Sequence, residues 1–214
     1  MKILDLFAGC GGFSLGFQME NFKPCLAIEI DQWASETYSY NHPKIPVLTK
    51  DIRKIDPKKL NLNKIDGIIG GPPCQGFSLS GNRDTKDPRN SLFIDFVRFV
   101  KILQPKFFVM ENVKGLLSMK TKKNLLVKDI ILDEFNRIKY NVSLQVLTSA
   151  NYGVPQVRER VFFIGLREDL LFDENKLIPK IDFSKKQYLK LWDDIYDLPQ
   201  INSGQSQVSH KYLL

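Results

Sequence analysis

The chain has 214 residues, 43% of them hydrophobic and 26% charged, which is the composition of an ordinary globular protein with one sizeable core. Its apolar runs are too short to span a bilayer, and its first residues lack the apolar stretch and small-residue cleavage site of a secretory signal. The three cysteines are an odd number without a CxxC pair, which favours reduced thiols over a disulfide framework. The composition therefore predicts a cytoplasmic protein with neither a membrane segment nor a metal site.

The net charge is +7, and much of the excess lies in two lysine-rich stretches, at 114–128 and 176–190. A basic chain can bind a polyanion because it releases condensed counterions. Solvated lysines on the outer faces of helices explain the charge equally well. Charge alone therefore does not assign a nucleic-acid partner.

The first two thirds of the chain alternate short apolar runs with longer amphipathic ones, which is typical of consecutive βαβ units. Strands are expected at 2–7, 25–29, 47–50, 66–70, 107–111, 142–147 and 161–166. Helices are expected at 13–19, 32–40, 92–103 and 125–138, with a short one at 188–198. The strands are apolar on both faces, as in a sheet covered by helices on each side. The expected fold class is α/β, a doubly wound and mostly parallel sheet with helices on both faces.

The first expected strand leads into a glycine-rich turn, FAGCGG at 7–12, which a helix follows. Glycines let the backbone turn tightly and approach a ligand at the carboxyl end of a strand. Glu29 ends the second strand, where doubly wound nucleotide folds place a carboxylate that binds ribose. Asp51 follows the third strand and could accept a hydrogen bond from an adenine amino group. A dinucleotide fingerprint would have glycine in place of Ser14, so the turn favours S-adenosylmethionine; a glycine turn without a ligand is the alternative.

A lone cysteine, Cys74, stands behind two prolines in the segment GGPPCQGFS at 70–78. Each proline fixes its own φ and pushes the preceding residue towards extended geometry, so the cysteine is expected on a stiff arm just beyond a strand. A thiolate there would be a nucleophile, whereas most lone cysteines are small buried residues. Because the diproline arm precedes Cys74 and the polar loop 81–90 follows it, a nucleophile and a small buried cysteine are about equally expected at this position.

Two further groups complete the candidate residues, and the first, Glu111, is expected at the same edge of the sheet as Cys74. Glu111 follows a buried strand, and a partly desolvated carboxyl group there can donate a proton or a hydrogen bond. A helix cap or an ion-paired glutamate is the alternative. In an extended segment Gln156, Arg158 and Arg160 share one face, which suits carbonyl or phosphate groups. A charged, exposed strand edge is the alternative for these three.

Four segments resemble, in order and spacing, the cofactor, nucleophile, acid and arginine motifs of cytosine-5 DNA methyltransferases: DLFAGCGGFSLGF, GGPPCQGFS, FFVMENVKGL and YGVPQVRERVFFIGLR. The resemblance covers residues 1–167. It implies a Rossmann-like fold that binds S-adenosyl-L-methionine.

Carried over residue by residue, the resemblance implies that Cys74 attacks carbon 6 of cytosine and that Glu111 contacts the ring nitrogen and amino group. Arg160 would bind the carbonyl oxygen of the base, and Arg158 would help to hold the active-site loop and the intermediate. Ile30 departs from the aromatic residue that some members have beside adenine, so weaker stacking is expected without loss of binding. The implied cofactor site consists of Phe7, Gly9, Gly11, Gly12, Glu29, Ile30, Asp51, Ile52 and Pro73.

The implied reaction starts with the thiolate, because carbon 5 of cytosine is too poor a nucleophile to take a methyl group unaided. Addition to carbon 6 creates an enamine, whose carbon 5 takes the methyl group; loss of the carbon-5 proton and elimination then free Cys74. The target base must leave the stacked duplex to be reached. The loop 81–90 would close over it, as mobile catalytic loops do.

In this family a target-recognition region and a last cofactor motif follow the arginine motif, and neither is found in 171–214. Residues 1–170 are therefore expected to form the catalytic, S-adenosylmethionine-binding domain, and 171–214 a partial extension towards the absent region. A split enzyme, a truncated copy and a trimmed piece are all consistent with this; split or truncated is favoured. The expected partners are double-stranded DNA and, in a split enzyme, a second polypeptide that supplies target recognition and the closing motifs.

The expected function is methylation of cytosine in DNA within a restriction-modification system. An RNA (tRNA) cytosine-5 methyltransferase would share this core and is one alternative; a non-catalytic remnant is another. A nicotinamide oxidoreductase would explain the glycine turn but would leave Cys74, Glu111 and Arg160 without a role.

Overall fold

The computed structural model describes residues 1–62, 64–73, 92–121, 124–170 and 188–198. The chain divides into two compact units, residues 1–147 with 159–180 and residues 148–158 with 181–214. Within the described ranges, no helix has both the length and the apolar run that a bilayer crossing requires.

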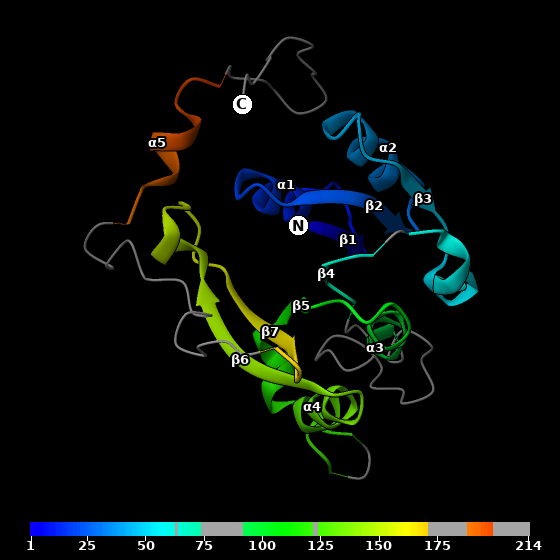
Figure 1. The fold of residues 1–214 in the computed structure, drawn as a ribbon. Helices are drawn as coiled ribbons and strands as arrows, with labels where there is room; N and C mark the ends of the chain where they lie inside the picture. Colours follow the sequence, from blue (N-terminus) through cyan, green and yellow to red (C-terminus); the bar gives the residue numbers. More distant parts are fainter. Residues whose placement is uncertain (63, 74–91, 122–123, 171–187, 199–214) are drawn as a thin grey trace. The chain divides into compact units, whose positions relative to one another are not determined.

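The described part of the first unit is built on a seven-stranded sheet with the order β3-β2-β1-β4-β5-β7-β6 (Figure 1). The neighbouring strands from β3 to β5 pair in parallel, whereas β7 runs antiparallel to β5. In chain order the strands are β1 (Lys2–Leu6), β2 (Lys23–Glu29), β3 (Val47–Thr49), β4 (Gly67–Gly70), β5 (Phe107–Val113), β6 (Tyr140–Thr148) and β7 (Glu159–Arg167).

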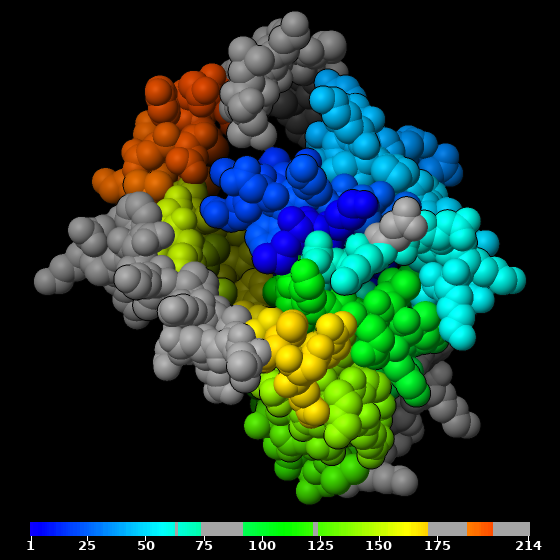
Figure 2. Space-filling model, in the orientation of Figure 1, coloured from blue at the N-terminus to red at the C-terminus, as the bar shows by residue number. Residues whose placement is uncertain are grey.

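The helices of the first unit are α1 (Gly12–Met19), α2 (Gln32–Asn41), α3 (Leu92–Leu103) and α4 (Val127–Arg137). Short 3₁₀ turns are η1 (Ile52–Lys54), η2 (Pro57–Leu60) and η5 (Lys114–Ser118). The segment with η1 and η2, cyan in Figures 1 and 2, lies beside α3, which is green. The described part of the second unit has η6 (Ser149–Tyr152) and α5 (Leu191–Ile195).

Both faces of the sheet are covered. Successive side chains of a strand point to opposite faces, and on β2 they enter different clusters. Ile28 belongs to the larger core, with Phe96 and Phe99 of α3. Ala27 belongs to a smaller core with Tyr38 of α2. The predicted fold class, a doubly wound and mostly parallel α/β sheet, is confirmed.

Candidate active site

The glycine turn between β1 and α1 depends on left-handed backbone geometry. Gly9 and Gly11 have φ of +54° and +94°, and Phe7 has φ of +59°. A Cβ at Gly11 would also meet the His42 ring and lie 2.9 Å from Cδ2 of Tyr38. This turn therefore needs glycine at position 11 for its own packing as well as for any ligand.

The carboxylate of Glu29 joins this turn to the end of β2. Its Oε2 accepts a hydrogen bond from the backbone N–H of Gly9 at 2.8 Å. Its Oε1 accepts from the backbone N–H groups of Ile30 at 2.8 Å and Asp31 at 2.9 Å. The acid is thus held in one orientation at the carboxyl edge of the sheet, where ligands of doubly wound folds bind.

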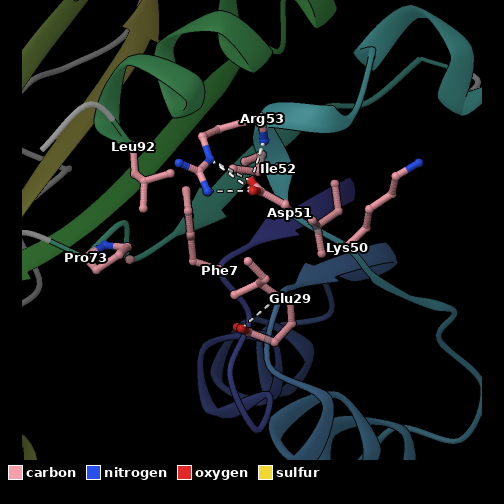
Figure 3. Close-up of a pocket in the computed structure, with 11 residues that line it drawn as sticks. Phe7, Glu29, Lys50, Asp51, Ile52, Arg53, Pro73 and Leu92 are labelled. Carbon is pink, nitrogen blue, oxygen red and sulfur yellow. Dashed lines mark hydrogen bonds and ion pairs between the residues drawn. The ribbon is translucent and has the colours of Figure 1, made fainter. Parts of the chain in front are cut away.

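A cavity of about 490 Å³ opens at this edge (Figure 3), within the usual size range of small-molecule sites. Of the predicted cofactor residues, the cavity lining includes Phe7, Glu29, Ile30, Asp51, Ile52 and Pro73. Gly9, Gly11 and Gly12 shape the turn and are not among the described residues that line the cavity. The other described residues of the lining were not predicted to bind the cofactor: Ile28, Lys50, Arg53, Gly71 and Leu92.

The carboxylate of Asp51 is bound by a neighbouring guanidinium. Arg53 Nη2 donates to Oδ2 at 2.6 Å, and Arg53 Nε donates to Oδ1 at 2.9 Å (Figure 3). This hydrogen bonding lowers the pKa of Asp51. Asp51 also caps η1, because it accepts from the backbone N–H of Arg53 at 3.0 Å. The acid is therefore charged and oriented, and a ligand amino group would share it with Arg53.

A second acid, Asp5, is fully buried behind the glycine turn. Its Oδ2 accepts from Ser14 Oγ at 2.7 Å, and Ser14 Oγ lies 2.7 Å from the hydroxyl of Tyr38. Burial raises the pKa of Asp5 to about 7. Ser14, which departs from the dinucleotide fingerprint, thus belongs to a buried network that joins β1, α1 and α2.

We expect Asp5→Asn to weaken the pH dependence of stability. Between pH 3.8, the ordinary pKa of this carboxyl group, and about pH 7, folded Asp5 retains a proton that the unfolded chain releases. Its contribution to the free energy of unfolding therefore falls as the pH rises through this window. Urea unfolding of the wild type from pH 5.5 to 8 should show a loss of about 2 kcal/mol from this group that the variant lacks. Asp129→Asn, at a more exposed position on α4, is the control and should keep the wild-type profile; an unchanged profile in Asp5→Asn would refute the assignment.

Glu111 and Arg160 meet where β5 and β7 pair. Arg160 Nε lies 2.7 Å from Glu111 Oε1, and both side chains are partly buried. Arg160 pairs with Val113 across the strands, because β7 runs antiparallel and begins where β5 ends. A Cβ at Gly71 would lie 2.9 Å from Glu111 Oε2, so this glycine makes room for the acid. The structure brings together the predicted acid and one predicted arginine, as an ion pair.

The diproline arm is held by a residue that sequence reasoning missed. Buried Asn112 of β5 donates from Nδ2 to the carbonyl oxygen of Pro72 at 3.0 Å. Its Oδ1 accepts from the backbone N–H of Val113 at 2.9 Å. β5 thus fixes the arm beside Glu111. Cys74, which follows Pro73, and the loop 81–90 lie outside the described residues.

Contrary to the prediction from the sequence, Gln156 and Arg158 do not lie in one continuous strand with Arg160. The backbone N–H of Gln156 donates to the carbonyl of Val154 at 2.7 Å, and β7 begins only at Glu159. Ser149 Oγ bonds to the carbonyl of Gln156 and accepts from the backbone N–H of Arg158. Pro155, which has no N–H and fixes φ, favours this bend over a continuous strand. Arg158 belongs to the second unit and Arg160 to the first.

Among the residues that the structure describes, no group of three or more His, Cys, Asp and Glu side chains could hold a metal ion.

The chain belongs to the C-5 cytosine-specific DNA methylase family, whose family model matches residues 1–214. It is 58% identical over 207 residues to the type II methyltransferase M.DdeI of Desulfomicrobium norvegicum. This match covers 96% of this chain and 50% of M.DdeI. It is 41% identical over 181 residues to M.AquIA of Picosynechococcus sp., covering 78% of this chain and 72% of that one. The chain thus spans about half the length of M.DdeI.

A solved structure agrees with this family. It is a candidate DNA modification methyltransferase encoded within an Escherichia coli prophage, 33% identical in sequence, with a TM-score of 0.78. The match covers 94% of this chain and 56% of that one. The predicted family is confirmed, and the roles predicted for single residues stay predictions.

Proposed function

We propose that this chain is the catalytic part of a DNA cytosine-5 methyltransferase of a restriction-modification system. The observation that carries the proposal is that two features lie side by side at the carboxyl ends of the strands. One is the cavity between Glu29 and Asp51, and the other is the Glu111–Arg160 pair beside the arm that leads to Cys74. In this proposal residues 1–170 form the catalytic domain, and the protein acts in the cytoplasm on double-stranded DNA.

The residues of the cavity fit S-adenosyl-L-methionine as the methyl donor. Glu29 is oriented by three backbone amides and would accept from ribose hydroxyls. Asp51 is held ionised and would accept from the adenine amino group. Phe7, Ile30 and Ile52 supply apolar walls for the adenine ring. When bound, this cofactor supplies the activated methyl group.

The chain's own groups would prepare the base. The Cys74 thiolate would add to carbon 6 of a flipped cytosine and would leave again once carbon 5 has gained a methyl group and lost its proton. Glu111 and Arg160 would hold the amino and carbonyl edges of the ring and stabilise the charge that develops on attack. Because Asn112 binds the arm before Cys74, the nucleophile and the acid would be positioned by the same strand.

Calorimetric titration with S-adenosylmethionine tests the cofactor assignment. The wild type should bind, and Glu29→Gln should bind about 10- to 100-fold more weakly, because charge-assisted hydrogen bonds to the ribose are lost. The matched control is Glu36→Gln on α2, whose carboxylate accepts from Gln32 and should not affect affinity. Circular dichroism checks that the variants are folded. A folded wild type that does not bind would refute the assignment.

Transfer of a labelled methyl group separates DNA from RNA as the substrate. Label in duplex DNA supports the proposal, and label in transfer RNA alone would overturn it.

A further inference from the structure

The guanidinium of Arg98, on α3, binds two backbone carbonyls of a separate segment. Its Nη2 donates to the carbonyl of Ile52 and its Nη1 to that of Ile55, each at 2.8 Å. Asp95, one turn earlier in α3, accepts from Nε at 3.1 Å and from Nη2 at 2.8 Å. The ring of Phe99, fully buried, lies 5.0 Å from the guanidinium carbon. The fork is therefore fixed on its own helix and directed at the neighbouring turn.

The two carbonyls belong to η1 and its C-cap, directly after β3. Among the described residues, the backbone bonds of this turn are short-range, from Lys54 N–H to the Asp51 carbonyl and from Ile55 N–H to the Ile52 carbonyl. β3 is a three-residue strand that pairs with β2 at the edge of the described sheet. Arg98 adds two hydrogen bonds from another element to the backbone of this turn.

This turn is one wall of the cavity. Residues 50–53 line it, while the side chains of Ile52 and Ile55 also enter the larger core. The first residue of α3, Leu92, lines the same cavity (Figure 3). Arg98 therefore joins two elements whose separation helps to set the width of the cavity. Arg98 is not one of the described lining residues.

We propose that Arg98 is a positioning residue for cofactor binding, which fixes the turn carrying Asp51 and Ile52 against α3 before the ligand arrives. The proposal rests on the proposed function, because the ligand is taken to be S-adenosylmethionine. Arg98 acts through the two carbonyls and does not touch the ligand. Its effect is therefore expected to be on affinity and on recognition of the adenine amino group.

The test compares Arg98→Gln and Arg98→Lys with the wild type by calorimetry with S-adenosylmethionine. The glutamine variant should bind at least about tenfold more weakly, and the lysine variant should bind between the two, because an ammonium cannot bridge both carbonyls as a planar fork does. Arg137→Gln on α4 is the matched control. That arginine also pairs with an acid three residues earlier, Glu134, but its side chain is 70% exposed, so binding should not change.

Two further readouts separate positioning from a general structural role. Hydrogen exchange of the backbone amides in 50–56 should become faster in Arg98→Gln, whereas exchange in α4 stays as in the wild type. The Asp51→Asn substitution should weaken binding less in the Arg98→Gln background than in the wild type. In that background the Asp51 carboxylate is displaced, so it already contributes less to the affinity for the ligand.

The outcomes are distinct. Wild-type affinity in a folded Arg98→Gln protein, with the full effect of Asp51→Asn retained, overturns the positioning role and leaves the proposed function standing. Unchanged exchange in 50–56 also overturns it, since Arg98 would then not hold the turn. A wild type that binds no S-adenosylmethionine overturns both proposals. If Arg98→Gln does not fold, the lysine variant decides, because it keeps the charge beside Asp95.

Discussion

Replacing Cys74 with serine is expected to lower methyl transfer to DNA by at least about a thousandfold, with cofactor affinity within about twofold of wild type. A serine hydroxyl is almost wholly protonated at neutral pH. A thiol is partly ionised at this pH, and the thiolate fraction is larger where the surroundings stabilise the anion. Transfer is measured with labelled S-adenosylmethionine, and affinity by calorimetry. The separation of the two effects follows from the proposal that Cys74 contacts the base.

Cys25→Ser is the matched control, since it makes the same atomic change elsewhere in the chain. Cys25 lies on β2 and donates to the carbonyl of Ile3 at 3.2 Å, a bond that a serine hydroxyl can also make. DNA with 5-fluorocytosine at the target gives a second readout, a covalent complex on a denaturing gel. Wild type and Cys25→Ser should form it and Cys74→Ser should not. Near-normal transfer by Cys74→Ser would place the nucleophile elsewhere.

Glu111→Gln is expected to lower methyl transfer by about 100- to 1000-fold without weakening cofactor binding. The amide cannot give a proton to the ring nitrogen as a carboxyl group can, and it leaves the partly buried guanidinium of Arg160 without its carboxylate. Steady-state transfer and calorimetry separate the two quantities. Urea unfolding measures how much stability the ion pair contributes.

Glu159→Gln is the control for Glu111. Glu159 also forms an ion pair on this edge, with Lys114 at 2.8 Å, but both partners are more exposed. Arg160 bonds the backbone carbonyl of Glu159, which the substitution leaves in place. Transfer should therefore stay within a few-fold of wild type. An equal loss in both variants would mean that the ion pairs support the sheet edge and do not act on the base.

The secondary structure follows from local patterns to a large extent. The predicted helix at 92–103 coincides with α3, because its apolar stripe has helical spacing and faces the core. The strand predicted at 107–111 continues to Val113, because β7 pairs with its last residues. The helix predicted from 125 begins at Val127, since Leu126 is extended and bridges to Lys120. The antiparallel orientation of β7 could not be predicted, because the apolar pattern of a strand does not show whether it runs parallel or antiparallel to its neighbour.

The acids of the candidate site were predictable for a related reason. Glu29 ends β2, Asp51 follows β3 and Glu111 lies near the end of β5, and parallel strands bring their carboxyl ends to one edge. The groups that orient them depend on tertiary contacts that the sequence does not reveal, such as the Asn112 bond to Pro72. One of these contacts does leave a signal in the sequence. Asp5 is a charged residue within an apolar strand, which indicates a buried acid with a hydrogen-bond partner.

The direct contact between Glu111 and Arg160 means that these two groups neutralise each other until a base arrives. A base that separates them must give the carboxylate a donor and the guanidinium an acceptor. Otherwise one partly buried charge loses its partner, which costs about 1–3 kcal/mol or more in binding free energy. Cytosine carries both an amino group and a carbonyl, whereas uracil and thymine carry a carbonyl in place of the amino group. The ion pair would then compete with the base: the amino group of cytosine can donate to the carboxylate, whereas the carbonyl at the same position of uracil or thymine would face it with a second acceptor.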